Sequence, residues 1–319
     1  MYACIDLGSN SFHLLIAEWK NRQIQLVERC SDIVQIGEGV QSTGRISPEA
    51  YARGLQSLEH FRSLIANYPV KRYWALGTNT FRTADNAEQF IADAAKLGIE
   101  IAVISGVQEA VLIYAGVISS LPKTGEERLV IDIGGGSTEI IVGKRHRRLI
   151  THSLPVGCVA WRDKYFSAGQ ETQSMADCLR EATTAARRLF AEVAPGVVAY
   201  HWADAYGSSG TAKMLASVCE EHGYAAGQIS LEALHALRDQ LVRAIELNET
   251  VPGLKDRRRD LLLPGLAVMC GLMEAIRCQS IKFSASALRE GMLHFMVRNR
   301  KTMKVLKQGD LPNVTIATN

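Results

Sequence analysis

Two stretches of the chain carry the same pattern and decide the fold. Residues 3–11 read ACIDLGSNS and residues 129–137 read LVIDIGGGS. Each is an apolar run that contains an aspartate, Asp6 or Asp132, followed by a glycine turn and a second apolar run, and the two patterns stand 126 residues apart. A polar turn and a third apolar run follow in both places. Each half of the chain is therefore predicted to open with the same three-strand meander.

After each meander the sequence alternates between helical and strand patterns. The first half predicts helices over 48–68 and 86–97 and strands over 73–77 and 99–104, and the second half predicts helices over 176–193, 211–222, 231–247 and 265–276, a strand over 281–284 and a last helix from 288. Parallel strands need crossover helices, so this order indicates an α/β fold of two similar lobes with a cleft between them. We expect the lobes to span 1–123 and 124–297, with a C-terminal helix at about 298–319 that packs back on the first lobe.

Composition excludes several classes of protein. Of 319 residues, 47% are hydrophobic and 22% are charged, and the net charge of +3 is too small to indicate nucleic acid or an anionic membrane as the main partner. The seven cysteines are scattered and contain no C-x-x-C pair, which favours buried thiols in a reducing compartment. The chain shows no secretory signal and no apolar run of the about 20 residues that a membrane span requires. We therefore expect a cytoplasmic protein.

The two glycine turns suggest phosphate chemistry. A strand that ends near a carboxylate and turns through Gly-x-x-Ser places that carboxylate beside backbone N–H groups and a hydroxyl, a combination suited to a metal-bound phosphate. Asp6 and Asp132 are the candidate ligands of Mg²⁺. The alternative is a tight hairpin capped by aspartate, but a hairpin has no structural need to repeat Asp-x-Gly-x-x-Ser.

Other candidate residues leave two readings open. Ser105 and Gln108 form a predicted capping box, so Glu109 lies in the first turn of a helix, where it either interacts with the helix dipole or activates a water for attack on phosphorus. The turn 207–211 either binds a phosphate or ribose or simply joins a strand to a helix. Arginines 82 and 289 are candidate phosphate ligands or ordinary surface residues, and the basic clusters 144–148 and 257–259 either guide a polyanion or are solvated turns.

Eight blocks, in order along nearly the whole chain, resemble the exopolyphosphatase / guanosine pentaphosphate phosphohydrolase (Ppx/GppA) family, of the actin, hexokinase and acetate-kinase superfamily. The blocks are residues 6–13, 77–82, 104–110, 131–139, 157–159, 209–211, 264–267 and 288–291. The resemblance implies two ribonuclease-H-like (actin-like ATPase) lobes. It also implies a homodimer that uses Mg²⁺, with Mn²⁺ as an alternative.

The activity that this resemblance implies is hydrolysis of the terminal phosphoanhydride of inorganic polyphosphate, with release of orthophosphate. The alternatives are removal of the 5′ phosphate of guanosine pentaphosphate and, more remotely, an ATP-dependent kinase or ATPase of the same fold. By the resemblance, Glu109 matches the catalytic glutamate. The full candidate set assigns catalysis to Glu109, metal binding to Asp6, Asp132 and Glu139, and phosphate binding to Gly8, Ser9, Asn10, Ser11, Thr78, Arg82, Gly134, Gly135, Gly136, Ser137, Ser209, Gly210, Thr211 and Arg289.

Two departures from the family pattern affect these expectations. The chain continues for only about thirty residues after the block 288–291, where longer relatives carry further helical domains, so we expect shorter substrates to be favoured. Gln108 precedes Glu109 where many relatives have a second acid. A non-catalytic signalling or filament protein is the least favoured reading, since both aspartates, Glu109 and Glu139 are all present.

Overall fold

The computed structural model describes residues 1–298 except 22, 123 and 168–172, so the helix expected at about 298–319 lies almost entirely outside the described residues. The chain divides into two compact units. Unit 1 consists of residues 1–121 together with the segment that begins at Ser286, and unit 2 consists of residues 122–285.

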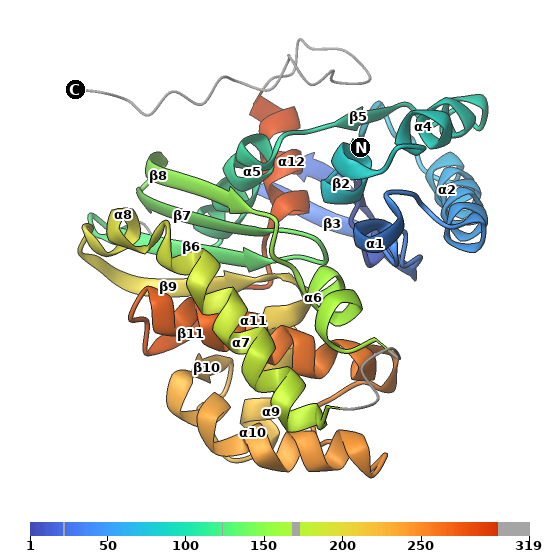
Figure 1. Cartoon of the computed structure of the whole chain (residues 1–319). Helices are drawn as coiled ribbons and strands as arrows, with labels where there is room; N and C mark the ends of the chain where they lie inside the picture. The colour runs from blue at the N-terminus through green and yellow to red at the C-terminus, as the bar shows by residue number, and fades with distance from the viewer. Residues whose placement is uncertain (22, 123, 168–172, 299–319) are drawn as a thin grey trace. The chain divides into compact units, whose positions relative to one another are not determined.

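A mixed sheet with the order β3-β2-β1-β4-β5 forms the centre of unit 1. Figure 1 labels its strands β2, β3 and β5. β1 pairs antiparallel with β2 and parallel with β4, as the predicted meander and crossover require. The strands are β1 (Tyr2–Leu7), β2 (Ser11–Lys20), β3 (Gln23–Ile33), β4 (Arg72–Gly77) and β5 (Ile101–Val103). β5 is shorter than the expected strand 99–104, because the amide of Ile99 bonds to the carbonyl of Ala94 and, with Gly98 at positive φ, completes a helix-ending Schellman motif.

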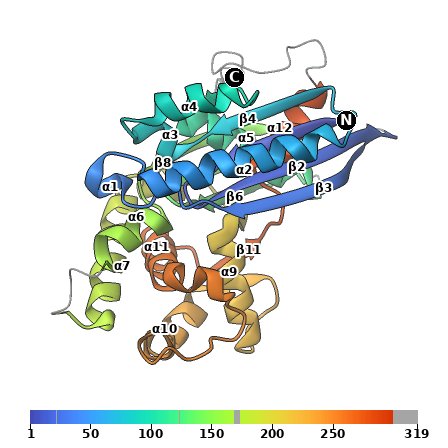
Figure 2. The same cartoon turned by 90° about the vertical axis from the view of Figure 1, so that its right-hand side faces the viewer.

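Helices cover both faces of this sheet. Side chains of β1 alternate between the faces, and those of Ala3, Ile5 and Leu7 join a core with the helices of one face, where Figure 2 shows α2 lying along the sheet. α5 and α12 pack against each other, and α12 contacts β1. The helices of unit 1 are α1 (Val40–Thr43), α2 (Pro48–Ala66), α3 (Asn79–Thr83), α4 (Ala87–Lys96), α5 (Gly106–Ser119) and α12 (Leu288–Arg298).

α12 belongs to unit 1, which differs from the expected lobe limits of 124–297. Two glycines allow its close approach to α5: a Cβ on Gly116 would lie 1.9 Å from the carbonyl oxygen of Ala287, and a Cβ on Gly291 would lie 1.9 Å from that of Leu112. The ring of Phe295 packs on that of Trp74 in β4, with 5.1 Å between centroids. Unit 1 is therefore built from two separate segments of the chain.

Unit 2 repeats the strand order of unit 1. Its sheet runs β10-β11-β9-β6-β7-β8, in which β8-β7-β6-β9-β11 corresponds to β3-β2-β1-β4-β5. Both units thus have the ribonuclease-H-like arrangement. The chain therefore has the two similar α/β lobes expected from its repeat, and their actin-like fold is the one that the family resemblance implied. The strands are β6 (Glu127–Ile133), β7 (Thr138–Lys144), β8 (Arg147–Leu154), β9 (Trp202–Ser208), β10 (Gln228–Ser230) and β11 (Ser280–Phe283).

The core of unit 2 lies on one face of its sheet, where side chains of β6 and β7 meet those of the surrounding helices. α11 starts at Leu262, three residues before the expected helix, since Pro264 is tolerated within the first turn. No helix in the described ranges combines the length and apolar character needed to cross a membrane. The helices are α6 (Cys158–Tyr165), α7 (Met175–Ala191), α8 (Ala194–Val198), α9 (Ser209–Glu221), α10 (Leu231–Glu246), the 3-10 helix η1 (Asp256–Leu261) and α11 (Leu262–Ala275).

Candidate active site

The two glycine turns have the same backbone hydrogen bond. The amide of Gly8 donates to the carbonyl of Ser11 at 3.2 Å, and the amide of Gly134 donates to that of Ser137 at 2.9 Å. In both turns the two middle amides, of residues 9 and 10 and of residues 135 and 136, have no acceptor within the described part of the chain. Backbone amides in such turns can bind an anion.

A row of polar side chains crosses the sheet of unit 2 beside its glycine turn. In the strand register, Asp132 on β6 lies opposite Glu139 on β7 and next to Ser208 on β9, while Glu139 lies opposite Ser153 on β8. Ser208 Oγ donates a short hydrogen bond to Asp132, and Ser153 Oγ donates to Glu139 Oε1 at 2.8 Å. The order across four strands is therefore hydroxyl, carboxylate, carboxylate, hydroxyl.

This row is suited to a hard divalent cation. Asp132 and Glu139 are 9% and 1% exposed, and like charges directly opposite each other in a ladder are destabilising. A cation between the carboxylates removes that repulsion, and carboxylate oxygens are the ligands that Mg²⁺ and Mn²⁺ prefer. Ser153 was not among the candidates from the sequence, and Ser208 was considered only as part of the turn 207–211, because their positions beside the carboxylates depend on strand register rather than on a motif.

The first glycine turn does not repeat this pair of acids. Asp6 lies opposite His13 in the ladder of β1 and β2, where the second repeat has Glu139. Unit 1 therefore places only one carboxylate, the half-buried Asp6, at the position equivalent to the two-carboxylate row of unit 2. The two repeats match in backbone and differ in the chemistry they offer.

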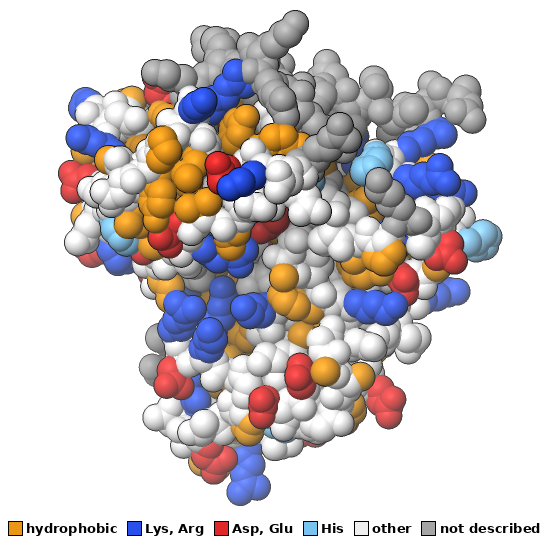
Figure 3. All heavy atoms as spheres, turned by 180° about the vertical axis from the view of Figure 1, so that it is seen from behind, with side chains coloured by type: hydrophobic (Ala, Val, Ile, Leu, Met, Phe, Trp, Pro, Cys, Tyr) orange, Lys and Arg blue, Asp and Glu red, His pale blue; other side chains and the backbone are white. Residues whose placement is uncertain are grey.

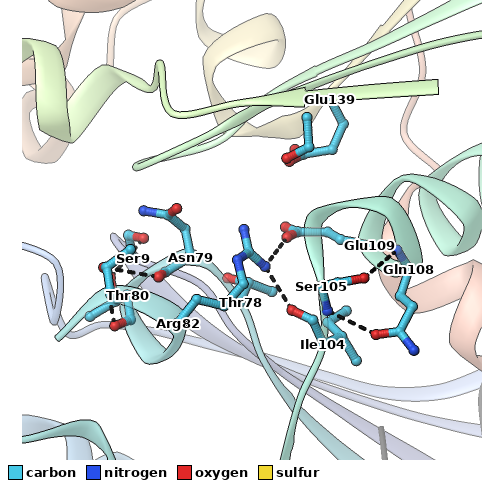
Figure 4. Close-up of polar contacts among 12 residues, drawn as sticks. Ser9, Thr78, Asn79, Thr80, Arg82, Ile104, Ser105, Gln108, Glu109 and Glu139 are labelled. Atoms are coloured by element: carbon cyan, nitrogen blue, oxygen red, sulfur yellow. Dashed lines mark hydrogen bonds and ion pairs between the residues drawn. The ribbon is translucent and has the colours of Figure 1, made fainter. Parts of the chain in front are cut away.

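Glu109 forms an ion pair inside unit 1 (Figure 4). Ser105 and Gln108 make the predicted capping box at the start of α5, which fixes Glu109 in the first turn. Arg82 Nη1 donates to Glu109 Oε2 at 2.9 Å and to the carbonyl of Ile104 at 2.9 Å. Burial raises the pKa of Glu109, and the neighbouring Arg82 opposes this rise. The structure thus joins two residues that the sequence had selected separately.

The first glycine turn is attached to α3. Thr80 Oγ1 donates to Ser9 Oγ at 2.8 Å (Figure 4), and Thr78 Oγ1 donates to the carbonyl of Leu7 at 3.2 Å. Asn10 Nδ2 donates to Ser11 Oγ at 3.1 Å. These bonds place Gly8–Ser11 and Thr78 in one hydrogen-bonded group, which continues along α3 to Arg82.

The third turn, at the start of α9, has a strained backbone and a basic neighbour. Ser209 has φ of +91°, which is uncommon for a residue with a side chain. A Cβ on Gly210 would lie 2.3 Å from Nη2 of Arg258, so the half-buried guanidinium rests directly on this turn. Thr211 is 2% exposed, and its hydroxyl bonds to the thiol of Cys158. Arg258 is a member of the cluster 257–259 that the sequence left unassigned.

The remaining basic candidates differ in their burial and in their hydrogen-bond partners. Arg259 donates to the carbonyls of Glu249 and Ala244, which is a structural role. Arg148 is 5% exposed, while residues 144–147 form an exposed turn. Arg289 lies half-buried on α12 in unit 1. On the face drawn in Figure 3, Lys and Arg side chains lie in separate groups among acidic and neutral ones.

Within unit 1 the structure joins Arg82 to Glu109 and the Gly8–Ser11 turn to the segment 78–82. Within unit 2 it joins Asp132, Glu139 and the Gly134–Ser137 turn, and the amides of Cys158 and Val159 bond to the carbonyls of Gly134 and Gly135. A Cβ on Gly157 would lie 2.4 Å from the carbonyl oxygen of Gly135, so that glycine is required for this contact.

Comparison with known proteins identifies the family. The model of the Ppx/GppA phosphatase family matches residues 15–300. A Haemophilus influenzae protein named "Putative exopolyphosphatase" is 35% identical over 307 residues, which cover 93% of this chain and 91% of the relative. Two crystal structures are 25% identical: an exopolyphosphatase from Cytophaga hutchinsonii, with a TM-score of 0.82 and coverage of 96% of this chain and 99% of that one, and a Ppx/GppA family member from Aquifex aeolicus, with a TM-score of 0.74 and coverage of 95% and 99%. With its repeated Asp-Gly-Ser turns and its paired carboxylates, the chain belongs to the Ppx/GppA phosphatase family.

Proposed function

We propose that the protein is an exopolyphosphatase that hydrolyses the terminal phosphoanhydride of inorganic polyphosphate and releases orthophosphate, with a preference for shorter chains. The observation that carries the proposal is the row in which Asp132 and Glu139 lie side by side, next to a glycine turn with two amides that have no acceptor among the described residues. The name of the Haemophilus influenzae relative, "Putative exopolyphosphatase", supports this choice of substrate.

The two carboxylates of this row are the residues that would hold Mg²⁺, and Asp6 is a further candidate ligand. When bound, the ion would neutralise negative charge on the phosphate oxygens. The amides of residues 135 and 136 would bind oxygens of the same phosphate chain, and Ser208 and Ser153 would orient the two carboxylates by the bonds they already donate.

Glu109 is the proposed general base. It would accept a proton from a water that attacks the terminal phosphorus, while the bond from that phosphorus to the bridging oxygen breaks and the shortened chain leaves with the electron pair. Arg82 would bind the terminal phosphate, since its guanidinium offers further donors beyond those it directs at Glu109 and Ile104. The products are orthophosphate and a polyphosphate shorter by one unit, with no covalent intermediate.

The experiment is a comparison of orthophosphate release from short polyphosphate, long polyphosphate, guanosine pentaphosphate and ATP at equal concentrations of terminal phosphate. Each substrate is tested with Mg²⁺, with Mn²⁺ and with EDTA, and Glu109→Ala is the blank. We expect release from polyphosphate, faster per end for short chains, to fall by about 10²- to 10⁴-fold in the variant.

The other outcomes are equally informative. Release from guanosine pentaphosphate alone would assign the alternative nucleotide activity. Formation of ADP from ATP, faster than release from polyphosphate, would favour an ATPase or kinase. Unchanged polyphosphate hydrolysis by Glu109→Ala would overturn the catalytic role of this residue. Glu49→Ala, at the corresponding first turn of α2, is a matched control for removing a helix N-terminal carboxylate and should leave hydrolysis intact.

A further inference from the structure

A cysteine, an aspartate and a histidine meet in unit 1 and belong to none of the groups described above. Cys30 and Asp32 stand two residues apart on β3, so their side chains leave the same face of the strand. His60 comes from α2, which lies along that face of the sheet (Figure 2). No sequence motif indicates this group, because His60 is separated from the other two residues by about thirty residues and the three lack any metal-binding spacing.

The geometry brings one potential ligand atom from each residue to a single point. His60 Nδ1 lies 3.1 Å from Asp32 Oδ2, and Cys30 Sγ lies 3.9 Å from Asp32 Oδ1. The three ligand atoms all lie within 4.8 Å of one another. Among the described residues, these three side chains form a group of His, Cys, Asp or Glu ligands that could hold a metal ion. Tetrahedral zinc with sulfur, nitrogen and oxygen ligands needs ligand atoms about 3.3–3.6 Å apart, so small side-chain rotations suffice.

The surroundings also fit a metal. The side chains of His60 and Asp32 are 49% and 28% exposed, which leaves a path for an ion and room for a water ligand. Cys30 is partly exposed, whereas the other cysteines of the chain are buried. Ser57, one helical turn before His60, donates to Asp32 Oδ2 at 2.8 Å and so orients the carboxylate, as outer-shell partners of metal ligands do.

We propose that Cys30, Asp32 and His60 form a binding site for a borderline-soft divalent cation, with Zn²⁺ as the best fit and water as the fourth ligand. Thiolate and imidazole ligands favour Zn²⁺ and disfavour the Mg²⁺ that suits the Asp132 row. On binding, the thiol of Cys30 releases its proton to solvent and the sulfur bonds to the metal. The bound ion would fasten β3 to α2, apart from the groups assigned to phosphate hydrolysis.

The test uses the metal-stripped full chain and Co²⁺ as a spectroscopic substitute for Zn²⁺. We expect one equivalent of Co²⁺ to produce a thiolate-to-metal charge-transfer band together with visible d–d bands, and Zn²⁺ to displace both. Cys30→Ser should abolish the charge-transfer band and His60→Asn should weaken binding strongly. Ser57→Ala should lower the affinity by roughly 10-fold through loss of the orienting bond.

Controls separate this site from the proposed hydrolytic one. Cys178→Ser, which removes a buried thiol on α7, should keep the band, and Asp132→Asn should keep the band while it loses phosphate release. Absence of a charge-transfer band in the wild-type protein, or its survival in Cys30→Ser, would overturn the proposal. A Zn²⁺-induced rise in the thermal midpoint that is absent in both Cys30→Ser and His60→Asn is the second expected result, and equal rises in all three proteins would contradict it.

Discussion

Replacement of Glu139 by glutamine tests whether unit 2 is built to hold a cation. Glu139 lies opposite Asp132 in the β6–β7 ladder, and both side chains are buried. The spacing of cross-strand pairs puts the two carboxylates about 5 Å apart. With an effective dielectric constant of about 20, the electrostatic repulsion between them is about 3 kcal/mol. Hydrogen bonds from Ser153 and Ser208 offset part of this repulsion, and we take the remainder as about 1.5 kcal/mol.

In EDTA, Glu139→Gln should therefore be more stable than the wild-type protein. The glutamine keeps the shape of the side chain and an oxygen that accepts from Ser153, so mainly the charge is lost. For a unit of this size, 1 kcal/mol corresponds to about 2–4 °C, so we expect the thermal midpoint to rise by roughly 3–6 °C. Saturating Mg²⁺, at about 100 times its Kd, should add about 2.7 kcal/mol to the wild-type protein and far less to the variant.

The assay is thermal unfolding followed by calorimetry, with and without Mg²⁺. Glu127→Gln is the matched control, since Glu127 occupies the other end of the same ladder opposite the cation of Lys144. Loss of the negative charge of Glu127 should lower the thermal midpoint slightly, by the same amount with and without Mg²⁺. A lower midpoint for Glu139→Gln in EDTA would refute the reasoning, because it would mean that the carboxylate stabilises the fold as a hydrogen-bond acceptor.

Two further predictions concern the candidate active site. Arg82 opposes the rise in the pKa of Glu109, so Arg82→Gln should raise that pKa further. The acid limb of the pH profile of kcat/KM should then move to higher pH. An acid limb that stays in place or moves to lower pH would count against Glu109 as the base. Gly157→Ala should place a methyl group against the carbonyl of Gly135, destabilise the protein by about 1–3 kcal/mol and reduce phosphate release, as measured by thermal unfolding and by the phosphate assay. Gly125→Ala, where a Cβ meets nothing within 4 Å, should change neither quantity, and equal effects of the two variants would contradict the assignment.

Much of the fold could be predicted from short-range patterns. The repeated aspartate and glycine turns led to two equivalent sheets, and the capping box at Ser105 placed Glu109 correctly in the first turn of α5. The position of α12 could not be predicted in the same way. It depends on how Gly116 and Gly291 let two helices approach, and that contact joins residues far apart in the chain.

The candidate site likewise contains some residues that a local motif predicts and others that only tertiary packing brings together. Asp132 and Glu139 are seven residues apart in one hairpin, so a motif can capture them, and their pairing in the ladder agrees with a shared role. Ser208 reaches Asp132 only through the parallel pairing of β6 with β9, and Arg258 reaches Gly210 only through the placement of η1. Those contacts depend on tertiary packing, which leaves no local pattern in the sequence.

The two-segment construction of unit 1 has a consequence for synthesis of the chain. Residues 122–285 of unit 2 are continuous, so this unit can fold as soon as it leaves the ribosome. Residues 1–121 emerge earlier and must wait for α12, which covers part of β1 and α5. During that interval the nascent chain carries all five strands of the unit 1 sheet without α12, so the apolar surface that α12 covers on β1 and α5 is open to chaperones. The first unit to begin translation is thus the last to be completed.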